Sequence, residues 1–276
     1  MSAGVRKRPN WLAGALTGVW LIVIAVPILS MISWSLQSQQ DLLDHGPLAP
    51  PSSITFENFQ AVMDMGFGRY MRNTLIVTGA GIALTLLLAV PAAYAVVRSR
   101  SLLAGASFRV FLLGLAIPAQ AVIIPVYLII TRMGLNDTLA AVILPTVAFN
   151  LPLVVLILSG SLRDISGELY DAMTVDGAGP LRMLVNLVLP LSRGSITTVS
   201  VFVGLGAWNS FIFPLIFLHS PDKKVLTLGL QSFRQEFGIN LPGMMMGVLL
   251  STLPVFVLYL FARRWLVAGL AGVGGK

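Results

Sequence analysis

The chain has 276 residues, of which 56% are hydrophobic and 11% are charged, and its formal net charge is +7. A soluble domain carries about 25% charged residues, so this composition excludes an ordinary soluble protein and favours a membrane protein. The basic residues stand singly or in small groups at the ends of apolar runs, which indicates membrane topology and excludes a broad basic face for nucleic acid.

Six apolar segments are long enough to cross a bilayer, which takes about 20 residues in a helix. The first, residues 11–36, follows the basic residues 6–8. It is too long for the apolar core of a signal peptide, and no small-residue cleavage site follows it, so we expect a retained helix. The other predicted spans are residues 73–97, 110–130, 139–161, 194–218 and 243–262.

No Asp, Glu, Lys, Arg or His lies inside these six segments. Carriers driven by protons or ions normally keep ionisable side chains inside the bilayer, so we expect the energy for transport to come from outside the spans. Prolines are frequent in the segments and allow two interpretations: ordinary kinks, or helices bent around a pathway that opens and closes. They are Pro27, Pro91, Pro118, Pro125, Pro145, Pro152, Pro214 and Pro254.

The connections between the spans differ in their content of basic residues. The N-terminus, the 98–109 loop, the 162–193 loop and the C-terminus together hold twice as many Lys and Arg residues as the connections on the other side. The positive-inside rule therefore predicts that both termini are cytoplasmic.

The sequence GELYDAMTVDGAGPLRMLVNLVLP, residues 167–190, predicts two short helices joined by a glycine turn. Ser166 can cap the first helix, which covers residues 168–175. Gly177 fits the left-handed position that ends a helix, and Pro180 fits the first turn of the second helix. The expected apolar faces are Leu169, Ala172 and Met173 in the first helix, and Leu181, Leu184, Val185 and Val188 in the second.

Helices this short are marginal in water, so these two must dock on something. Two alternatives are open: they pack on the cytoplasmic ends of their own bundle, or they project as a knob into the groove of a partner. A polar rim accompanies the helices and is formed by Glu168, Asp171, Asp176 and Arg182.

Several kinds of site are absent from the sequence. The chain has no cysteine, which excludes disulfides and thiolate metal sites. The only Gly-Lys pair is Gly275-Lys276, and no Ser or Thr follows it, so there is no Walker loop for ATP. We find no G-x-S-x-G elbow and no intramembrane acid–base pair. We therefore expect no catalytic residues, no metal site and no cofactor bound by this chain.

The 162–193 loop resembles the EAA loop of ATP-binding-cassette importer permeases. That pattern is E-A-A, two residues, D-G-A, and a hydrophobic stretch that ends in L-P. It corresponds here to Asp171-Ala172-Met173, Asp176-Gly177-Ala178 and Leu189-Pro190, with Asp for Glu and Met for Ala as departures. The resemblance implies a coupling helix seated in a cleft of a cytoplasmic ATPase. The implied docking residues are Glu168, Asp171, Ala172, Met173, Asp176, Gly177 and Ala178, with Asp171 paired to a basic residue of the ATPase.

Other segments resemble the carbohydrate importer permeases, the family that includes the G subunit of maltose transporters. They are YMRNTLIVT (70–78), IPVYLIITRMGLNDTLAAVILPTVAFNLPL (124–153), AWNSFIFPLIF (207–217), LTLGLQSF (226–233) and TLPVFVLYLFARRWLVAGLAGVGGK (252–276). The likeness covers nearly all of residues 54–276. It implies an all-α fold of the type I importer permease class. The resemblance further implies a single permease domain over residues 1–276, with six transmembrane helices and the coupling loop 162–193, in the bacterial cytoplasmic membrane.

The resemblance also implies the partners of the chain. A homologous permease completes a heterodimeric pore in the membrane lipid, and two copies of a cytoplasmic ATPase hold the ATP and Mg. An extracytoplasmic solute-binding protein delivers the cargo. In this family the extreme C-terminus can also touch the ATPase, and here that segment is GLAGVGGK, residues 269–276.

An uncharged polar cargo fits spans that carry amides and hydroxyls and no charge, and the resemblance makes a sugar or related polyol the expected class. Candidates for lining its route are Thr146, Asn150, Asn209 and Ser210; the alternative is that these side chains hydrogen-bond between helices. The outer segment TFENFQAVM, residues 55–63, predicts an amphipathic interfacial helix or a docking surface for the binding protein.

Three other functions stay open on the sequence. The first is an importer of the same kind for a non-sugar cargo such as a polyamine. The second is a secondary transporter, which the charge-free spans disfavour. The third is a membrane scaffold without transport.

Overall fold

The protein is described by a computed structural model over residues 11–47, 49–99, 101–235 and 238–273. The basic residues 6–8, Arg100 and Lys276, which contribute to the predicted orientation, lie outside these ranges, as do residues 274–276 of the expected C-terminal contact. Contacts divide the chain into two compact units: a terminal unit, residues 1–66 and 230–253, and a bundle unit, residues 67–229 and 254–276.

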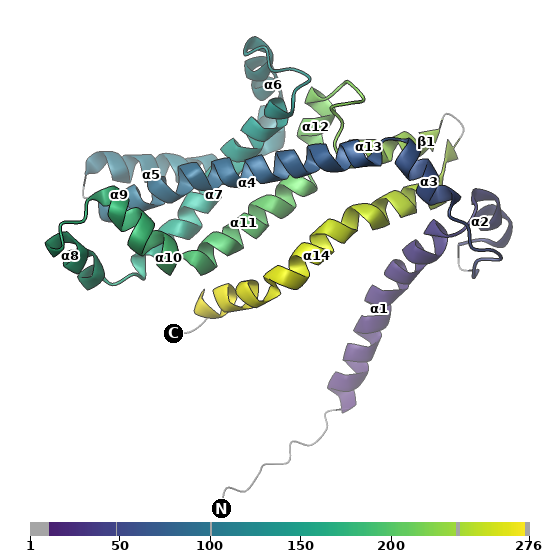
Figure 1. The fold of residues 1–276 in the computed structure, drawn as a ribbon, viewed down its shortest axis with the longest axis horizontal. Coiled ribbons are helices and arrows are strands. Elements are labelled where there is room, and N and C mark those ends of the chain that lie inside the picture. The colour runs from purple at the N-terminus through teal and green to yellow at the C-terminus, as the bar shows by residue number, and fades with distance from the viewer. Residues whose placement is uncertain (1–10, 48, 100, 236–237, 274–276) are drawn as a thin grey trace, which may run out of the picture. The chain divides into compact units, whose positions relative to one another are not determined.

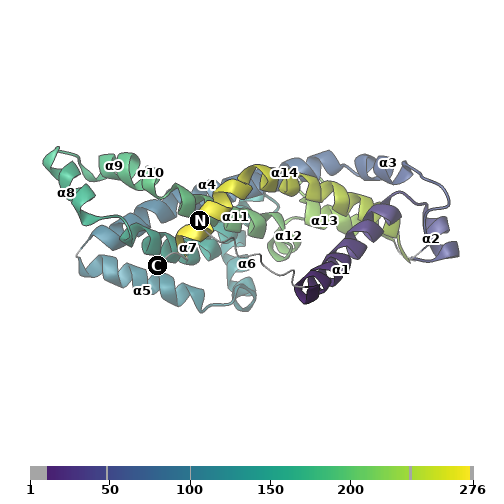
Figure 2. The same ribbon diagram turned by 90° about the horizontal axis from the view of Figure 1, so that it is seen from below.

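The bundle unit is built around four helices, which are α4 (Phe67–Arg98), α5 (Leu102–Leu115), α7 (Leu139–Arg163) and α11 (Arg193–Trp208). Helix α4 packs against both α7 and α11, and α5 packs against α7 (Figures 1 and 2). Small residues permit this close packing: a Cβ on Gly204 of α11 would lie 3.1 Å from the Ile82 side chain of α4.

Two buried apolar clusters hold the bundle together. One lies toward the end of α4 and includes Ala89 and Ala93 of α4, Leu158 of α7 and Val199 of α11. The other lies toward the opposite end and joins Val77 of α4 to residues of α7 and of the 217–228 segment. Together they bury one face of each of these helices, and the rest of the apolar surface stays exposed, as expected for helices that face lipid.

Four helices are long and apolar enough to cross a membrane. They are α1 (Trp11–Ser35), α4, α7 and residues 241–260 of α14 (Leu241–Val273). Two bent pairs also pass this test. Helix α5 makes an angle of 95° with the unit formed by η1 (Ala119–Val122) and α6 (Ile123–Arg132), and the 180–191 segment makes an angle of 79° with α11. Length and composition therefore allow four to six crossings in the described part, and the all-α class is confirmed.

Two predicted spans are interrupted. The predicted 110–130 segment contains the end of α5 at Leu115, and the chain turns before η1 begins, because Pro118 has no N–H to continue the helix. The predicted 194–218 segment contains the end of α11 at Trp208, and α12 (Ile212–Phe217) begins after a break of three residues. Mean hydropathy did not reveal these breaks, although Pro118 lies at the first and the polar residues Asn209 and Ser210 lie at the second.

The terminal unit contains α1, α2 (Gln39–His45), α3 (Glu57–Asp64), η3 (Leu230–Phe233), the start of α14, and a short antiparallel pair of β1 (Arg234–Gln235) and β2 (Gly238–Ile239). Helix α1 is apolar on all sides, and the apolar window that marks it as a span has no buried residue. Helix α3 buries Asn58 and Val62, whereas Phe59, and Phe56 just before the helix, are exposed. At the start of α14, a Cβ on Gly247 would meet Leu230 at 2.5 Å, so glycine is needed there for contact.

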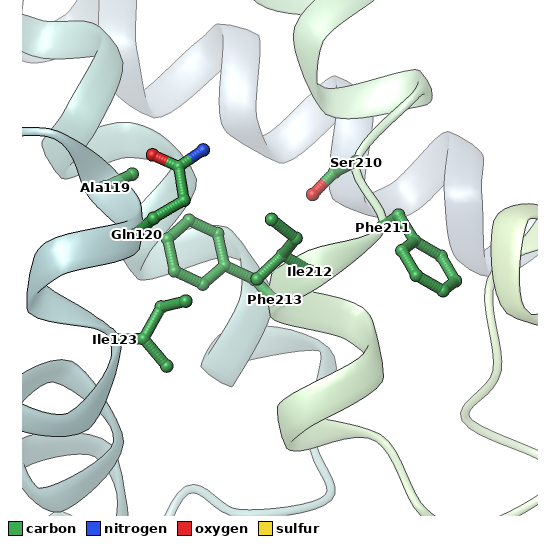
Figure 3. A pocket seen from close by; sticks show the side chains of 7 residues that line it. All are labelled: Ala119, Gln120, Ile123, Ser210, Phe211, Ile212 and Phe213. Carbon is green, nitrogen blue, oxygen red and sulfur yellow. The ribbon is translucent and has the colours of Figure 1, made fainter.

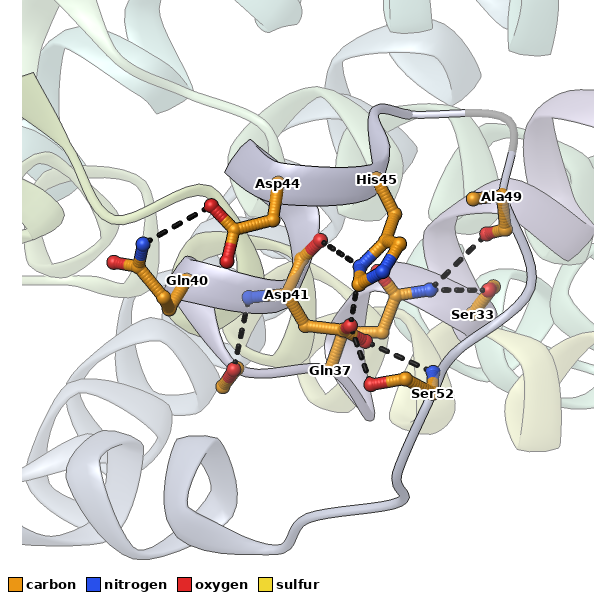
Figure 4. A network of polar contacts seen from close by, with 9 residues as sticks. Ser33, Gln37, Gln40, Asp41, Asp44, His45, Ala49 and Ser52 are labelled. Carbon is orange, nitrogen blue, oxygen red and sulfur yellow. Dashed lines mark hydrogen bonds and ion pairs between the residues drawn. The ribbon is translucent and has the colours of Figure 1, made fainter.

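A polar network fixes the loop that follows α2 (Figure 4). The buried Asp41 carboxylate accepts hydrogen bonds from the backbone N–H of Ser52, at 3.0 Å, and from the Ser52 hydroxyl. It also lies 3.0 Å from Nδ1 of His45. The hydrogen bonds from Ser52 hold the pKa of Asp41 below its usual value, and the His45 contact adds to this effect. The network ties Ser52 to the short helix.

Candidate functional site

The 162–193 loop folds as two helical segments joined by a tight glycine turn. The first is α8 (Gly167–Val175), and the Ser166 hydroxyl accepts a hydrogen bond from the N–H of Glu168 at its start, at 3.3 Å. The second consists of α9 (Pro180–Met183), the wide π turn η2 (Leu184–Val188) and α10 (Leu189–Leu191). Helix, turn and second helix are confirmed, together with the cap by Ser166 and the placement of Pro180 at the helix start.

The turn has the hydrogen bonds of a Schellman motif. The N–H of Ala178 donates to the carbonyl of Met173 at 2.9 Å, and the N–H of Gly177 donates to the carbonyl of Thr174 at 3.0 Å. Gly177 has a φ of 73°, in the left-handed region that favours glycine, as its place in the sequence predicted. The turn therefore fixes the angle between α8 and the helix that follows it.

One face of the loop is buried against the chain's own bundle. Tyr170 is 1% exposed, and Ala178, Met183 and Val188 belong to the same buried cluster as α4, α7 and α11. The Arg98 guanidinium at the end of α4 lies 4.2 Å from the centroid of the Tyr170 ring, which is a cation–π contact. The rings of Tyr94 and Tyr170 also stack, with centroids 6.4 Å apart. The loop is thus attached to the end of α4.

Burial raises the pKa of the Tyr170 hydroxyl, and the charge of Arg98 partly offsets that rise. The hydroxyl oxygen has no hydrogen-bond partner within the described ranges. The ring, more than the hydroxyl, therefore accounts for the contact. Sequence reasoning missed Tyr170 and Arg98, although Tyr170 is the single aromatic residue of the 162–193 loop, which was a usable signal.

The opposite face of the loop is exposed and combines acidic with apolar groups. Val175 is 88% exposed and Leu181 is 73% exposed. Glu168, Asp171 and Asp176 are also exposed, and none of them forms an ion pair in the part of the chain that the structure describes. We call this exposed face the docking surface and define it by Glu168, Leu169, Asp171, Ala172, Val175, Asp176 and Leu181.

The predicted apolar faces were partly wrong. Leu169 and Ala172 point outward in α8, whereas the unpredicted Tyr170 is buried beside the half-buried Met173. In the second helix the buried residues are Met183, Leu187 and Val188, while Leu181 and Val185 are exposed. Each helix carries two apolar stripes, and periodicity does not tell which of them meets the bundle. Among the expected docking residues, Met173 and Ala178 turn inward, and the other five are exposed.

The four expected pathway residues do not gather at one site. Thr146 and Asn150 lie on α7, and each donates to a carbonyl one turn back in its own helix, at 2.8 and 2.7 Å. Asn209 does the same at the end of α11, with the Leu205 carbonyl at 2.9 Å. These three side chains therefore satisfy their own helices and not a neighbouring helix. Ser210 differs, because it lines a cavity of about 210 Å³ (Figure 3).

The N-terminal end of α4 holds the segment that follows α12. The side-chain amide of Asn73 donates to the carbonyls of Asp222 and Lys224, at 2.8 and 2.9 Å. The Thr74 hydroxyl accepts from the N–H of Leu226 at 2.9 Å. This segment continues into α13 (Leu226–Gly229). Helix α4 therefore contacts the coupling loop at one end and the 222–229 segment at the other.

Asp137, in the loop between α6 and α7, also holds the segment that follows α12. Its carboxylate accepts from the N–H groups of His219 and Ser220, at 2.9 and 3.0 Å, and from the Ser220 hydroxyl. The hydrogen bonds from Ser220, followed by that from His219, lower the pKa of Asp137 to about 2. In the described ranges, no three His, Cys, Asp or Glu residues come together in a way that could hold a metal ion.

The chain is similar to known membrane transport proteins. Residues 81–271 match a family described as "Binding-protein-dependent transport system inner membrane component". The chain is 32% identical to a putative ABC transporter permease of Caldicellulosiruptor sp. (strain Rt8B.4), over 91% of this chain and 92% of that protein. It is 30% identical to a diacetylchitobiose uptake system permease of Streptomyces coelicolor, over 99% of this chain and 91% of that protein.

The fold is similar to that of a chain in the crystal structure of a bacterial ABC transporter involved in the import of the acidic polysaccharide alginate. The TM-score is 0.79, and the match covers 95% of this chain and 99% of that chain. The sequence identity is 21%, so this likeness concerns the fold alone.

Proposed function

Because the chain belongs to the binding-protein-dependent transport system inner membrane component family, we propose that it forms half of the route by which a neutral sugar crosses the bacterial cytoplasmic membrane. The chain is a multi-pass permease subunit of an ABC importer. The sugar class is supported by the relative that takes up diacetylchitobiose and by predicted spans without ionisable side chains.

The observation that carries the proposal is the two-sided geometry of the coupling loop. One side is locked to the end of α4 through Tyr170 and Arg98. The other side is the docking surface, where exposed apolar side chains stand beside three carboxylates without ion-pair partners in the described residues. An apolar surface with an acidic rim suits a groove on a basic partner. We assign this partner as a separate cytoplasmic ATPase.

Helix α4 supplies a rigid connection from that surface to the far side of the bundle. A displacement of α8 is passed to Arg98 and Tyr94 because the Tyr170 side chain is enclosed between them and the bundle. The other end of α4 carries Asn73, which holds the 222–224 backbone. Closure of the ATPase dimer would thus move the 222–224 segment, because α4 is one continuous helix of 32 residues that connects the two ends.

The rest of the proposed assembly follows the family. A homologous permease completes the pore, two ATPase copies bind ATP and Mg and carry out hydrolysis, and an extracytoplasmic binding protein delivers the sugar. Both termini lie on the cytoplasmic side in this arrangement, as does the coupling loop. The order of events is alternating access driven from the cytoplasm.

The test is uptake by the complete importer in proteoliposomes, with the purified binding protein and ATP supplied to the ATPase side. We expect labelled diacetylchitobiose or another neutral sugar to enter only with ATP hydrolysis. If the importer took up spermidine and no sugar, the cargo would be a polyamine. Uptake driven by an ion gradient without ATP would make the chain a secondary transporter, and hydrolysis unaffected by damage to the docking surface would make it a scaffold.

A further inference from the structure

Two interrupted spans of the bundle unit contribute residues to one cavity. Residues 116–118 separate α5 from η1, and residues 209–211 separate α11 from α12. Both breaks fall inside predicted spans. Within a bilayer, backbone that is not helical is tolerated where it is buried in protein or lines a water-filled cavity. The position of two breaks beside one cavity therefore indicates a polar or hydrated space at this depth.

The cavity between the breaks has a volume of about 210 Å³. Figure 3 shows the Gln120 side chain next to the Phe213 ring on one side and the Ser210 hydroxyl on the other. Among the described residues, no charged side chain lines it. The lining residues are Ala119, Gln120, Ile123, Ser210, Phe211, Ile212 and Phe213.

The two polar side chains of this cavity have no hydrogen-bond partner among the described residues. Neither the Gln120 amide nor the Ser210 hydroxyl makes a hydrogen bond to another described residue, in contrast to Thr146, Asn150 and Asn209. The backbone of Ser210 is nevertheless fixed, because its carbonyl accepts from the Thr227 hydroxyl at 2.7 Å. An amide offers both donors and an acceptor, and a hydroxyl offers one donor and an acceptor. Gln120 is exposed and Ser210 is half-buried, so both groups are accessible to a ligand that donates and accepts hydrogen bonds.

Two other aromatic rings pack against the Phe213 ring. It stacks on Phe149 of α7, with centroids 5.6 Å apart, and on Phe217, with centroids 6.4 Å apart. A fixed aromatic ring offers an apolar face to the C–H groups of a sugar ring. A charged ligand would lose its hydration here without gaining a counter-charge, so the chemistry of the cavity favours a neutral polyhydroxylated ring.

We propose that Gln120, Ser210 and Phe213 form a subsite for one ring of a neutral sugar in transit. The proposal rests on the proposed function and assigns roles to Gln120 and Phe213, which the sequence did not single out. The ring lies against Phe213, and its hydroxyl groups exchange hydrogen bonds with Gln120 and Ser210. The subsite belongs to this subunit and not to the binding protein.

The first test measures sugar molecules moved per ATP hydrolysed by the complete importer in proteoliposomes. Gln120→Leu and Phe213→Leu are each expected to lower this ratio about fivefold, the effect of one lost hydrogen bond or aromatic contact. The control variants Gln60→Leu and Phe202→Leu change exposed residues that do not line the cavity and should leave the ratio unchanged. If the wild-type importer moves sugar and the cavity variants match the controls, the subsite is overturned and the proposed function stands. If the wild type moves no neutral sugar, both fail.

The second test uses the absence of cysteine from the chain. Gln120→Cys and Ser210→Cys are labelled with N-ethylmaleimide in the assembled importer, with and without binding protein loaded with the sugar that the wild type imports. We expect the sugar to slow labelling at both positions and not at the control Phe202→Cys. Equal labelling rates with and without sugar at 120 and 210 would overturn the subsite even if the transport variants were misfolded.

Discussion

The Arg98 guanidinium lies 4.2 Å from the centroid of the Tyr170 ring and joins the end of helix α4 to the first helix of the coupling loop. The Tyr170 side chain is also stacked on Tyr94 and is enclosed by the bundle. The loop therefore cannot shift far without moving the end of α4. This contact is the mechanical link of the proposed importer, and it leads to the first two predictions.

Replacing Arg98 tests the link directly. Arg98→Gln removes the cation from the Tyr170 ring and should lower stability by about 1 kcal/mol, the typical worth of a cation–π contact. It should also reduce sugar-stimulated ATP hydrolysis. Arg163→Gln is the matched control, because Arg163 lies 5.8 Å from the Phe108 ring and makes a weaker contact outside the link. Thermal unfolding in detergent and ATPase assays measure both effects, and equal losses in the two variants would argue against a special role for Arg98.

Two substitutions of Tyr170 distinguish the contribution of the ring from that of the hydroxyl. Because the buried hydroxyl has no partner in the described residues, Tyr170→Phe should keep coupling and leave the melting temperature unchanged or higher. Tyr170→Leu loses the ring and should cost at least about 1 kcal/mol together with much of the stimulated hydrolysis. A strong loss in Tyr170→Phe would show that the hydroxyl has a partner in the assembled complex and would contradict this account.

The turn of the coupling loop depends on one glycine. Gly177 has a φ of 73° with nothing within 4 Å of an added Cβ, so Gly177→Ala should cost about 1–2 kcal/mol through the backbone alone. Gly179→Ala is the control: the φ of Gly179 is −76°, and its surroundings are equally open. We expect lowered thermal stability and weaker ATPase binding in the first variant only. Similar behaviour of the two variants would mean that the Schellman turn is not needed.

Asp137 predicts a pH dependence on the outer side. Its pKa is lowered to about 2 by the hydrogen bonds from Ser220 and His219. A lowered carboxyl pKa stabilises the folded state above the unfolded pKa of about 3.9, and this contribution is lost as the pH falls through 4 toward 2. Asp137→Asn keeps a residue that tolerates the positive φ of 56° and removes the charge. The variant should be less stable than wild type at pH 7, and the difference should vanish near pH 2. A difference that is constant with pH would exclude a role for the charge.

The local signals of the coupling loop could be read from the sequence. Ser166, Gly177 and Pro180 each have one backbone position that suits them, and the structure places all three there. The inward face could not be read in the same way, because it depends on where Tyr170 meets Arg98, far away in the sequence. Periodicity reports apolar stripes within a helix and not their partners.

The positions of the helix breaks could not be predicted from the sequence for a different reason. Pro91, Pro145 and Pro152 lie inside continuous helices, whereas Pro118 stands at a break. Proline removes one backbone donor in every case, and the packing around it decides whether the helix continues. The break at residues 209–211 contains no proline at all. Gln120 and Phe213, which meet only because of these breaks, were therefore beyond reach of the sequence.

The most direct test of the central claim is cross-linking from the docking surface. Val175→Cys places a unique thiol at a position that is 88% exposed, and Leu103→Cys, at a position that is 79% exposed on α5, is the matched control. Each variant is assembled into the importer and treated with a thiol-specific photoreactive cross-linker. The account predicts that Val175→Cys is joined to the ATPase subunit and that Leu103→Cys is not. An importer that hydrolyses ATP but yields no ATPase adduct from position 175 would contradict it.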